Sequence, residues 1–364
     1  MTRPEEAHAS QGPAALEFMR GDAASDFLRP GSGATDELVA LERRVHSAEP
    51  DGATAAPVLL HPAGPVVESW FAAAVPRGTQ QRGCLSFRTD GHWLIGTARV
   101  DDRRHPGGME GAAEQAYREL FALLQSSASP QLLRLWNYIA DINVETGGIE
   151  RYRQFNVGRQ QAFLAARRTA FDGAPAACAL GTRDGPLTVH FLAGPQPSVA
   201  VENPRQVSAY RYPSDYGPSS PTFSRAALAV LGGDREAMFI SGTASIVGHA
   251  TQHLGDVRAQ TEETLRNIDA LLARAAELGA ARPQAIHRRD ALDCTVYVRH
   301  AGDLGVIRET FERSVGPDSA SARRAIYLHA DICRADLLVE IEAQSVAAIG
   351  SGTRRVVPIH QGQS

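Results

Sequence analysis

The sequence predicts an α+β fold made of two similar units, each a mixed sheet with helices packed on one face. Three observations predict it. A chain of 364 residues with 43% hydrophobic content is long enough for two ordinary domains. Segments with strand character alternate with segments of helical spacing. The order of these segments in the first half recurs in the second, which indicates an internal repeat.

The first unit is predicted to begin with two strands and an amphipathic helix. Ala113, Tyr117, Leu120 and Leu124 share one face of that helix. The predicted elements are strands 84–87 and 92–100, helix 111–125, strand 133–142, helix 150–168, and strands 177–181 and 187–193.

The second unit repeats this order around a long helix. Val257, Leu265, Ile268, Leu272 and Ala275 keep helical spacing there. The predicted elements are strand 237–247, helix 255–279, strand 293–300, helix 303–315, and strands 324–332 and 337–343.

The remaining segments complete the domain organisation. Residues 1–56 are rich in Ala, Gly, Ser, Asp and Glu, which predicts a loosely packed or partly disordered leader with a short helical stretch near 36–45. Residues 195–225 carry six prolines, so we expect this segment to pack across the junction and form a pocket wall. We therefore divide the chain into a leader (1–56), an N-terminal domain (57–195), a connecting segment (196–236), a C-terminal domain (237–348) and a tail (349–364).

Composition excludes several function classes. The chain contains no lysine, since all 37 basic residues are arginine, so neither a Schiff base nor a Walker A lysine is available. The net charge of −4 and the scattered arginines predict no nucleic-acid partner. No apolar run is long enough to span a membrane, and the first residues lack an apolar signal stretch, so a cytoplasmic protein is expected.

The sequence also predicts neither a metal nor an organic cofactor. The four cysteines lie far apart at no zinc-like spacing. His249 and His253 are four residues apart near a helix start, a spacing that can hold a metal, but no third ligand is in view. No pair of histidines with a carboxylate indicates a non-haem iron oxygenase.

Several motifs resemble known families. The C-terminal half resembles the Rid/YjgF (chorismate-mutase-like) fold through Phe-Ile-Ser-Gly-Thr-Ala-Ser at 239–245, the pair Arg323-Arg324 and Val-Glu-Ile-Glu-Ala at 339–343. The segments 135–143, 148–159 and 212–225 of the N-terminal half and connecting segment are similar to the chorismatases. That family joins a divergent first domain to a Rid-like second one, and the resemblance covers roughly residues 57–345. It implies cleavage of chorismate without metal or organic cofactor.

Chorismate carries two carboxylates, so its site needs two cationic anchors, and its cleavage needs an acid to protonate the enol ether. The resemblance implies that Glu340 is this acid and that Arg324, opening the strand paired with that of Glu340, holds a substrate carboxylate. Arg323 then points to the opposite face. The alternative for Glu340 is a plain solvated strand face, on which Glu340 and Glu342 alternate with apolar residues.

Other candidates lie on a helix, in the connecting segment and on a strand. Tyr152, Asn156 and Arg159 share one helix face, which is either solvated or brings Tyr152 and Arg159 to the substrate. Proline-fixed backbone could present Tyr216 and Arg225, although a tyrosine in such a turn is usually a packing residue. Gly242 indicates either close backbone approach at the pocket or a bulge.

The resemblance also frames the product. In the family, alanine or glycine near the ring favours 3-hydroxybenzoate, and a cysteine at one strand position favours a trans-dihydroxycyclohexadiene acid. The resemblance puts Ala330 at that position, with Gly248 nearby and Cys333 close, so 3-hydroxybenzoate is expected and hydrolysis to the diol is the alternative. A Rid-like small-molecule binding protein or deaminase is the alternative from another class. Monomer and trimer both remain open.

Overall fold

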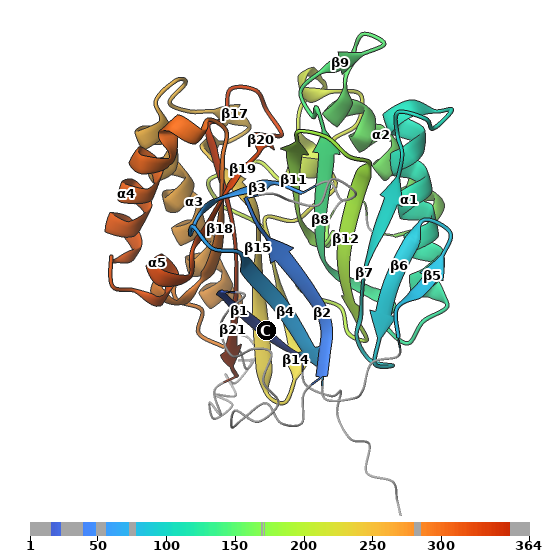
Figure 1. Cartoon of the computed structure of the whole chain (residues 1–364), viewed down its shortest axis with the longest axis horizontal. Helices are drawn as coiled ribbons and strands as arrows, with labels where there is room; N and C mark the ends of the chain where they lie inside the picture. Colours follow the sequence, from blue (N-terminus) through green and yellow to red (C-terminus); the bar gives the residue numbers. More distant parts are fainter. Residues whose placement is uncertain are drawn as a thin grey trace, which may run out of the picture.

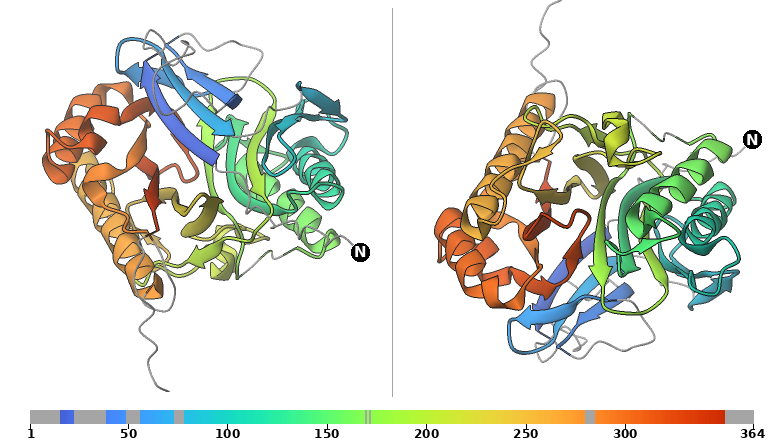
Figure 2. Two further views of the ribbon diagram at one scale, coloured as in Figure 1. Left: turned by 90° about the horizontal axis from the view of Figure 1, so that it is seen from below. Right: turned by 90° about the horizontal axis from the view of Figure 1, so that it is seen from above.

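Two seven-stranded sheets form the body of the molecule, and helices cover their outer faces (Figure 1). A three-stranded sheet bridges them (Figure 2). The structure, a computed structural model, describes residues 16–22, 39–48, 56–72, 78–168, 170, 172–279 and 285–349.

The first seven-stranded sheet has the order β20-β11-β8-β12-β7-β6-β5. Only β11 and β8 are parallel. Helices α1 (Gly108–Gln125) and α2 (Arg151–Ala165) pack against each other, and α1 contacts β7 and β12. The strands are β5 (Gln80–Arg82), β6 (Leu85–Thr89), β7 (Leu94–Val100), β8 (Gln131–Ala140), β11 (Ala176–Thr182), β12 (Leu187–Gly194) and β20 (Asp331–Ile332).

The second seven-stranded sheet has the order β13-β14-β15-β21-β18-β19-β3, with β18 and β19 parallel. Helices α3 (Val257–Gly279) and α4 (Leu304–Val315) pack together, and α3 covers β15 and β21. The strands are β3 (Val58–His61), β13 (Val199–Val201), β14 (Ala226–Gly232), β15 (Arg235–Ala244), β18 (Asp293–Val298), β19 (Ile326–His329) and β21 (Val339–Ala348).

The two sheets share one topology. In each, five strands and two helices follow the same order along the chain, and the parallel pair occupies the same place. The predicted α+β fold of two similar units is therefore confirmed.

Each unit nevertheless contributes a strand to the sheet of the other. β20 belongs by sequence to the second unit but pairs with β11, at Leu180 with Ile332 and Gly181 with Asp331. β3 belongs by sequence to the N-terminal domain but pairs with β19 at the edge of the second sheet. The predicted N-terminal domain included 58–61, but this strand belongs to the second sheet.

The segment expected to be a loose leader contributes two ordered strands. β1 (Leu16–Asp22) and β2 (Val39–His46) pair with the two edges of β4 (Val66–Ala72). The helix predicted near 36–45 is wrong over its described part, which is β2. Its Ala, Leu, Glu and Arg residues favour a helix, but pairing with β4 overrides that local propensity.

Apolar side chains fill both faces of the sheets. Tyr117, Leu120, Phe155 and Phe163 lie between the first sheet and its helices, and Ile268, Ile307 and Phe311 lie between the second sheet and its helices. A third core lies where the helix-free faces and the small sheet meet. It contains Trp70, Trp93, Trp136, Phe239 and Tyr297.

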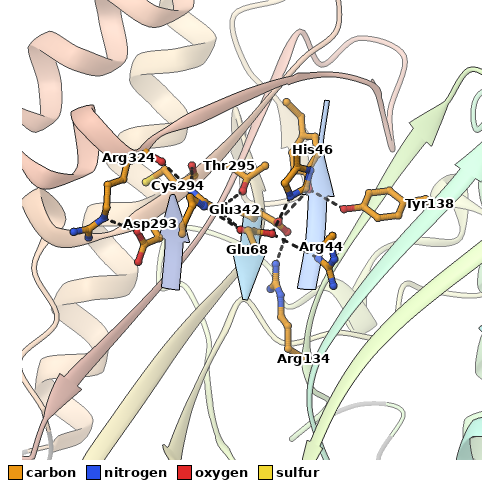
Figure 3. A network of polar contacts seen from close by, with 12 residues as sticks. Arg44, His46, Glu68, Arg134, Tyr138, Asp293, Cys294, Thr295, Arg324 and Glu342 are labelled. Carbon is orange, nitrogen blue, oxygen red and sulfur yellow. Dashed lines mark hydrogen bonds and ion pairs between the residues drawn. The ribbon is translucent and has the colours of Figure 1, made fainter. Parts of the chain in front are cut away.

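Buried ions accompany this central core (Figure 3). Glu68 of β4 accepts a hydrogen bond from Arg20 Nη2 at 2.5 Å, and its other oxygen lies 2.9 Å from His46 Nε2. Arg134 of β8 donates to Glu342 of β21 at 2.5 Å and so joins the first sheet to the second. A cavity of about 10 Å³ among these side chains has room for little more than a water molecule.

Candidate active site

A cavity with a volume of about 520 Å³ lies between the two units. It falls within the usual range for a small-molecule site. Its walls come from the start of α2, the connecting segment, β15, β21 and the loop after β20. Five of the eight predicted site residues line it: Glu340, Tyr152, Tyr216, Arg225 and Gly242.

Glu340 is the carboxylic acid at the base of this cavity. It lies on β21, between β15 and β18, and only 3% of its surface is exposed. Burial raises the pKa of its carboxyl group to about 8, and the nearby Glu342 carboxylate adds to the rise. Arg134, Arg299 and Cys333 act against it. Glu340 is therefore protonated at neutral pH, as a general acid must be.

Gly242 gives Glu340 its space. A Cβ at position 242 would overlap the Glu340 carboxylate and approach Cys178 Cβ at 3.3 Å. The β15–β21 register also shifts between Ile240 and Thr243. Both readings of this glycine, close approach and a bulge, thus apply at the same position.

The connecting segment forms an aromatic and cationic wall. Arg225 donates through Nη2 to Tyr212 Oη at 2.7 Å and to the Val207 carbonyl at 2.8 Å, and its buried Nε has no hydrogen-bond partner. Tyr216 donates to the His249 carbonyl at 2.8 Å. Tyr212 and Tyr216 are in ring contact, with centroids 5.2 Å apart. The segment expected to pack across the junction does so.

Arg334 is a second cation in the wall, which sequence reasoning did not single out. Its guanidinium lies 4.2 Å from the centre of the Tyr216 ring and 5.1 Å from that of Tyr212. Nη1 donates to the His249 carbonyl at 2.8 Å, whereas the buried Nη2 has no hydrogen-bond partner. Arg334 can therefore accept an anionic ligand without giving up its existing contacts.

Cys333, beside Arg334, contacts the acid. Its thiol lies 3.9 Å from Glu340 Oε2, and burial, followed by Glu340, raises the pKa of the thiol to about 12. It is therefore a neutral group at physiological pH. Arg299 fixes this loop by donating to the carbonyls of Ile332 at 3.0 Å, Arg334 at 2.8 Å and Leu337 at 2.6 Å.

The predicted polar face of α2 is divided. Tyr152 lines the cavity, and burial raises the pKa of its phenol. Arg159 is buried behind the cavity wall, where it donates to the Thr222 carbonyl and lies over the rings of Tyr117 and Phe155. The face is therefore not solvated, and Arg159 supports the connecting segment from behind.

Known proteins match this chain over most of its length. A family profile described as "Chorismatase FkbO/Hyg5-like, N-terminal" matches residues 68–193. A 3-hydroxybenzoate synthase from Streptomyces hygroscopicus is 37% identical over 77% of this chain and 81% of its own length. A chorismatase from Streptomyces rapamycinicus is 39% identical over 76% of this chain and 80% of its own length. The chain belongs to the chorismatase family.

A solved chorismatase structure agrees. It superposes with a TM-score of 0.77 at 30% identity, covering 92% of this chain and 99% of the other. The expectation of a chorismatase, and of an enzyme, is thus confirmed. Within the described residues, no group of three His, Cys, Asp or Glu side chains could hold a metal. No helix in the part of the chain that the structure describes is long and apolar enough to cross a bilayer.

Besides Arg159, two more residues expected in the chorismatase site, Arg324 and Ala330, lie outside the cavity lining. Arg324 ends the short helix α5 (Ala320–Arg324) instead of opening a strand, and the following strand β19 pairs with β18 and β3, not with β21. Its guanidinium pairs with Asp293 at 2.6 Å on the surface, and Arg323 is also at the end of α5. Ala330 is buried in the central core, and Cys333 is the first residue after it that lines the cavity.

Proposed function

We propose that this chain cleaves chorismate to pyruvate and 3-hydroxybenzoate, with Glu340 as the acid that protonates the enolpyruvyl group. One observation carries this assignment. Glu340 is a buried carboxylic acid with a pKa of about 8, and it shares a cavity with the guanidinium groups of Arg225 and Arg334. A proton donor and two anion-binding groups are what this substrate needs.

Binding follows from the chemistry of the walls. Arg225 donates to the Tyr212 hydroxyl, and Arg334 lies over the Tyr212 ring. Each guanidinium has one buried N–H group without a hydrogen-bond partner. Each guanidinium can thus bind one substrate carboxylate, an interaction worth about 1.5–3 kcal/mol when charged groups are involved. The rings of Tyr212, Tyr216 and Phe223 offer apolar surface to the cyclohexadiene ring.

Protonation then starts the reaction. Glu340 transfers its proton to the terminal methylene of the enol ether, which becomes the methyl group of pyruvate. The positive charge that develops on the ether carbon is shared with its oxygen and faces the newly formed Glu340 carboxylate. In the lyase reaction a ring oxygen becomes the carbonyl oxygen of pyruvate, the bonds that join pyruvate to the ring break, and the ring proton lost on aromatisation replaces the proton given up by Glu340. In hydrolysis water adds to the ether carbon, the bond between that carbon and the ring oxygen breaks, and a proton of the water replaces that of Glu340.

The product depends on where the carbonyl oxygen of pyruvate comes from. Chorismate is isomeric with pyruvate plus hydroxybenzoate, so the lyase reaction consumes no net water and the ring keeps one of its two oxygens. Hydrolysis adds one water, and the ring keeps both oxygens as a diol.

The product assignment rests on the relative named 3-hydroxybenzoate synthase. Ala330 does not support this product, because it does not line the cavity. Cys333 is on it, and by the family rule stated above a cysteine favours the diol, so hydrolysis remains the second candidate. The chorismatase relatives favour chorismate cleavage over the alternatives of a binding protein or a deaminase.

The test is an assay of purified protein with chorismate. Released pyruvate is measured with lactate dehydrogenase, and the aromatic fraction is resolved by chromatography against 3-hydroxybenzoate and diol standards. Pyruvate with 3-hydroxybenzoate supports the proposal, pyruvate with the diol replaces it by hydrolysis, and no pyruvate refutes both.

The role of Glu340 is tested by Glu340→Gln. Glutamine keeps the shape but cannot deliver a proton to carbon, so kcat should fall by roughly 10²–10⁴ at every pH with little change in chorismate binding. Normal turnover by this variant would show that another group is the acid.

A further inference from the structure

Two buried carboxyl groups lie on the same face of β21. Glu340 and Glu342 are two residues apart, and their exposed fractions are 3% and 6%. Ionising both would place two negative charges close together away from water, which is costly. The pair therefore keeps one proton at pH values well above the ordinary pKa of a carboxyl group. Which carboxyl holds that proton depends on their different partners.

Glu342 has the partners of a carboxylate. Arg134 donates to its Oε2 at 2.5 Å, and Tyr297 donates from its hydroxyl to Oε1 at 3.0 Å. Arg134 is itself fixed by a second hydrogen bond, from Nη1 to the Ile240 carbonyl at 3.1 Å. Figure 3 shows Arg134 rising from β8 toward Glu342. Charge-assisted hydrogen bonds of this kind stabilise the ionised form.

Glu340 has no comparable support. The Cys333 thiol, a weak donor, lies 3.9 Å from its Oε2. The titratable and charged groups around the carboxyl pair come from seven segments: Arg134 and Tyr138 (β8), Tyr152 (α2), Cys178 (β11), Arg225 (the connecting segment), Asp293, Tyr297 and Arg299 (in and after β18), Cys333 and Arg334 (the loop after β20), and Arg20, Arg44 and Glu68 (the small sheet).

We propose that Arg134 and Glu342 are positioning residues that keep the proton of the carboxyl pair on Glu340. The inference rests on the proposed function, since it concerns how the acid of that reaction is loaded. Arg134 belongs to the first unit and Glu340 to the second, so the first unit supplies the charge that assigns the proton without touching the substrate.

The two partners act on Glu340 with opposite signs. The Glu342 carboxylate raises the pKa of Glu340, and Arg134 lowers it. Because Glu340 must be protonated to act, kcat/KM of the parent should be constant at lower pH and fall as pH rises through about 8. Removing the Glu342 charge should move this alkaline limb of the pH profile, the fall in kcat/KM above about pH 8, to lower pH. Removing the Arg134 charge should move it to higher pH.

The first experiment compares Glu342→Gln with the parent, with pyruvate release measured from pH 5.5 to 10. Glutamine can keep hydrogen bonds to Arg134 and Tyr297 but carries no charge. The alkaline limb should move to lower pH, and each unit of movement lowers relative activity on the alkaline side about tenfold. The matched control is Glu309→Gln, which removes an exposed carboxylate on α4 and should leave the profile unchanged. An alkaline limb at the parent's pH, with only its height reduced, would overturn the proposal.

The second experiment changes the cation. Arg134→Met removes the charged partner of Glu342, so the proton should be less firmly placed on Glu340 and the plateau should fall; the alkaline limb should move to higher pH, because Arg134 lowers the pKa of Glu340. Arg134→Lys retains the charge and should restore the parent's limb, even if its hydrogen bonds are poorer. If Arg134 had a purely structural role, Arg134→Met would lower kcat/KM at every pH without moving the alkaline limb. That result would also overturn the proposal.

The pair of experiments separates this inference from the proposed function. If the parent releases no pyruvate from chorismate, the proposed function itself is wrong. If the parent is active and Glu340→Gln is inactive at every pH, the acid assignment stands. The position of the limb in the Glu342 and Arg134 variants then decides the inference alone. Should Glu342→Gln not fold, the Arg134→Met and Arg134→Lys profiles decide it.

Discussion

The α-carbon of Gly242 lies against the carboxylate of Glu340 so closely that a Cβ at 242 would overlap it. β15 and β21 are neighbouring antiparallel strands, and their register shifts at this point. The absence of a side chain at 242 is what allows an acid to occupy this place on a central strand.

Gly242→Ala should therefore damage catalysis more than stability. The backbone at 242 is outside the positive-φ region, so alanine fits the local conformation; its methyl must displace the end of the Glu340 side chain and shift Cys178 Cβ, at 3.3 Å, only slightly. We expect kcat to fall about 10²-fold, the usual cost of misplacing a reacting group by about 1 Å. Thermal unfolding of the variant measures its stability. Gly302→Ala, where the added methyl meets nothing within 4 Å, is the control. Parent-like kcat in Gly242→Ala would show that Glu340 has room elsewhere.

Arg334→Ala should weaken chorismate binding. Loss of a charged hydrogen-bond partner costs about 1.5–3 kcal/mol, equivalent to roughly 10- to 150-fold in KM. Arg324→Ala, expected from sequence to have this effect, should instead behave as the parent, because Arg324 forms an exposed pair with Asp293. Steady-state kinetics of both variants provide the comparison. A larger KM in Arg324→Ala than in Arg334→Ala would show that Arg324, and not Arg334, binds the substrate.

Turnover should persist in EDTA without added nucleotide, pterin or flavin. The described residues offer no three-ligand metal group, and the proposed chemistry needs only a proton and two cations. Pyruvate release before and after dialysis against chelator tests this directly. Loss of activity that iron or zinc restores would contradict it.

Stability should decline in acid through Glu68. Its burial raises the pKa, but Arg20, His46 and Arg44 together outweigh this and hold the pKa well below 4.5. A lowered pKa means that the unfolded chain takes up the proton first, so stability present at neutral pH is lost as pH falls below 4.5. Urea unfolding from pH 7 to 3 should show a shallower pH dependence in Glu68→Gln than in the parent. Equal slopes would mean that other carboxylates dominate.

Hydrophobic periodicity predicted most of the two units because their elements are long and each buries one face. It failed where local and tertiary preferences differ. At 36–45, pairing with β4 overrides helix propensity. At Arg324, a local signal existed and was missed: Ser319 is the N-cap of α5 and accepts a hydrogen bond from the Ala322 amide at 3.0 Å, which starts a helix that includes Arg324.

The candidate site was predictable where its residues lie on regular elements or in recognisable motifs. Glu340, Gly242 and Tyr152 are of this kind. Arg334 and Cys333 lie on an irregular loop whose course depends on hydrogen bonds from Arg299 and on pairing of β20 with the first sheet. Neither contact is local in sequence, so no pattern around residue 334 could have revealed them.

The strands exchanged between the units also decide how this molecule meets its neighbours. Exposed strand edges are templates for aggregation, and very short edge strands are poor templates. β20 and β3 cap one edge of each large sheet with two and four residues, and β5 and β13 form the opposite edges with three residues each. The outermost strand at each edge of these two sheets is therefore at most four residues long. Because each unit places a short strand at one edge of the other unit's sheet, the enzyme is protected from the edge-to-edge association between molecules that two large sheets would otherwise favour.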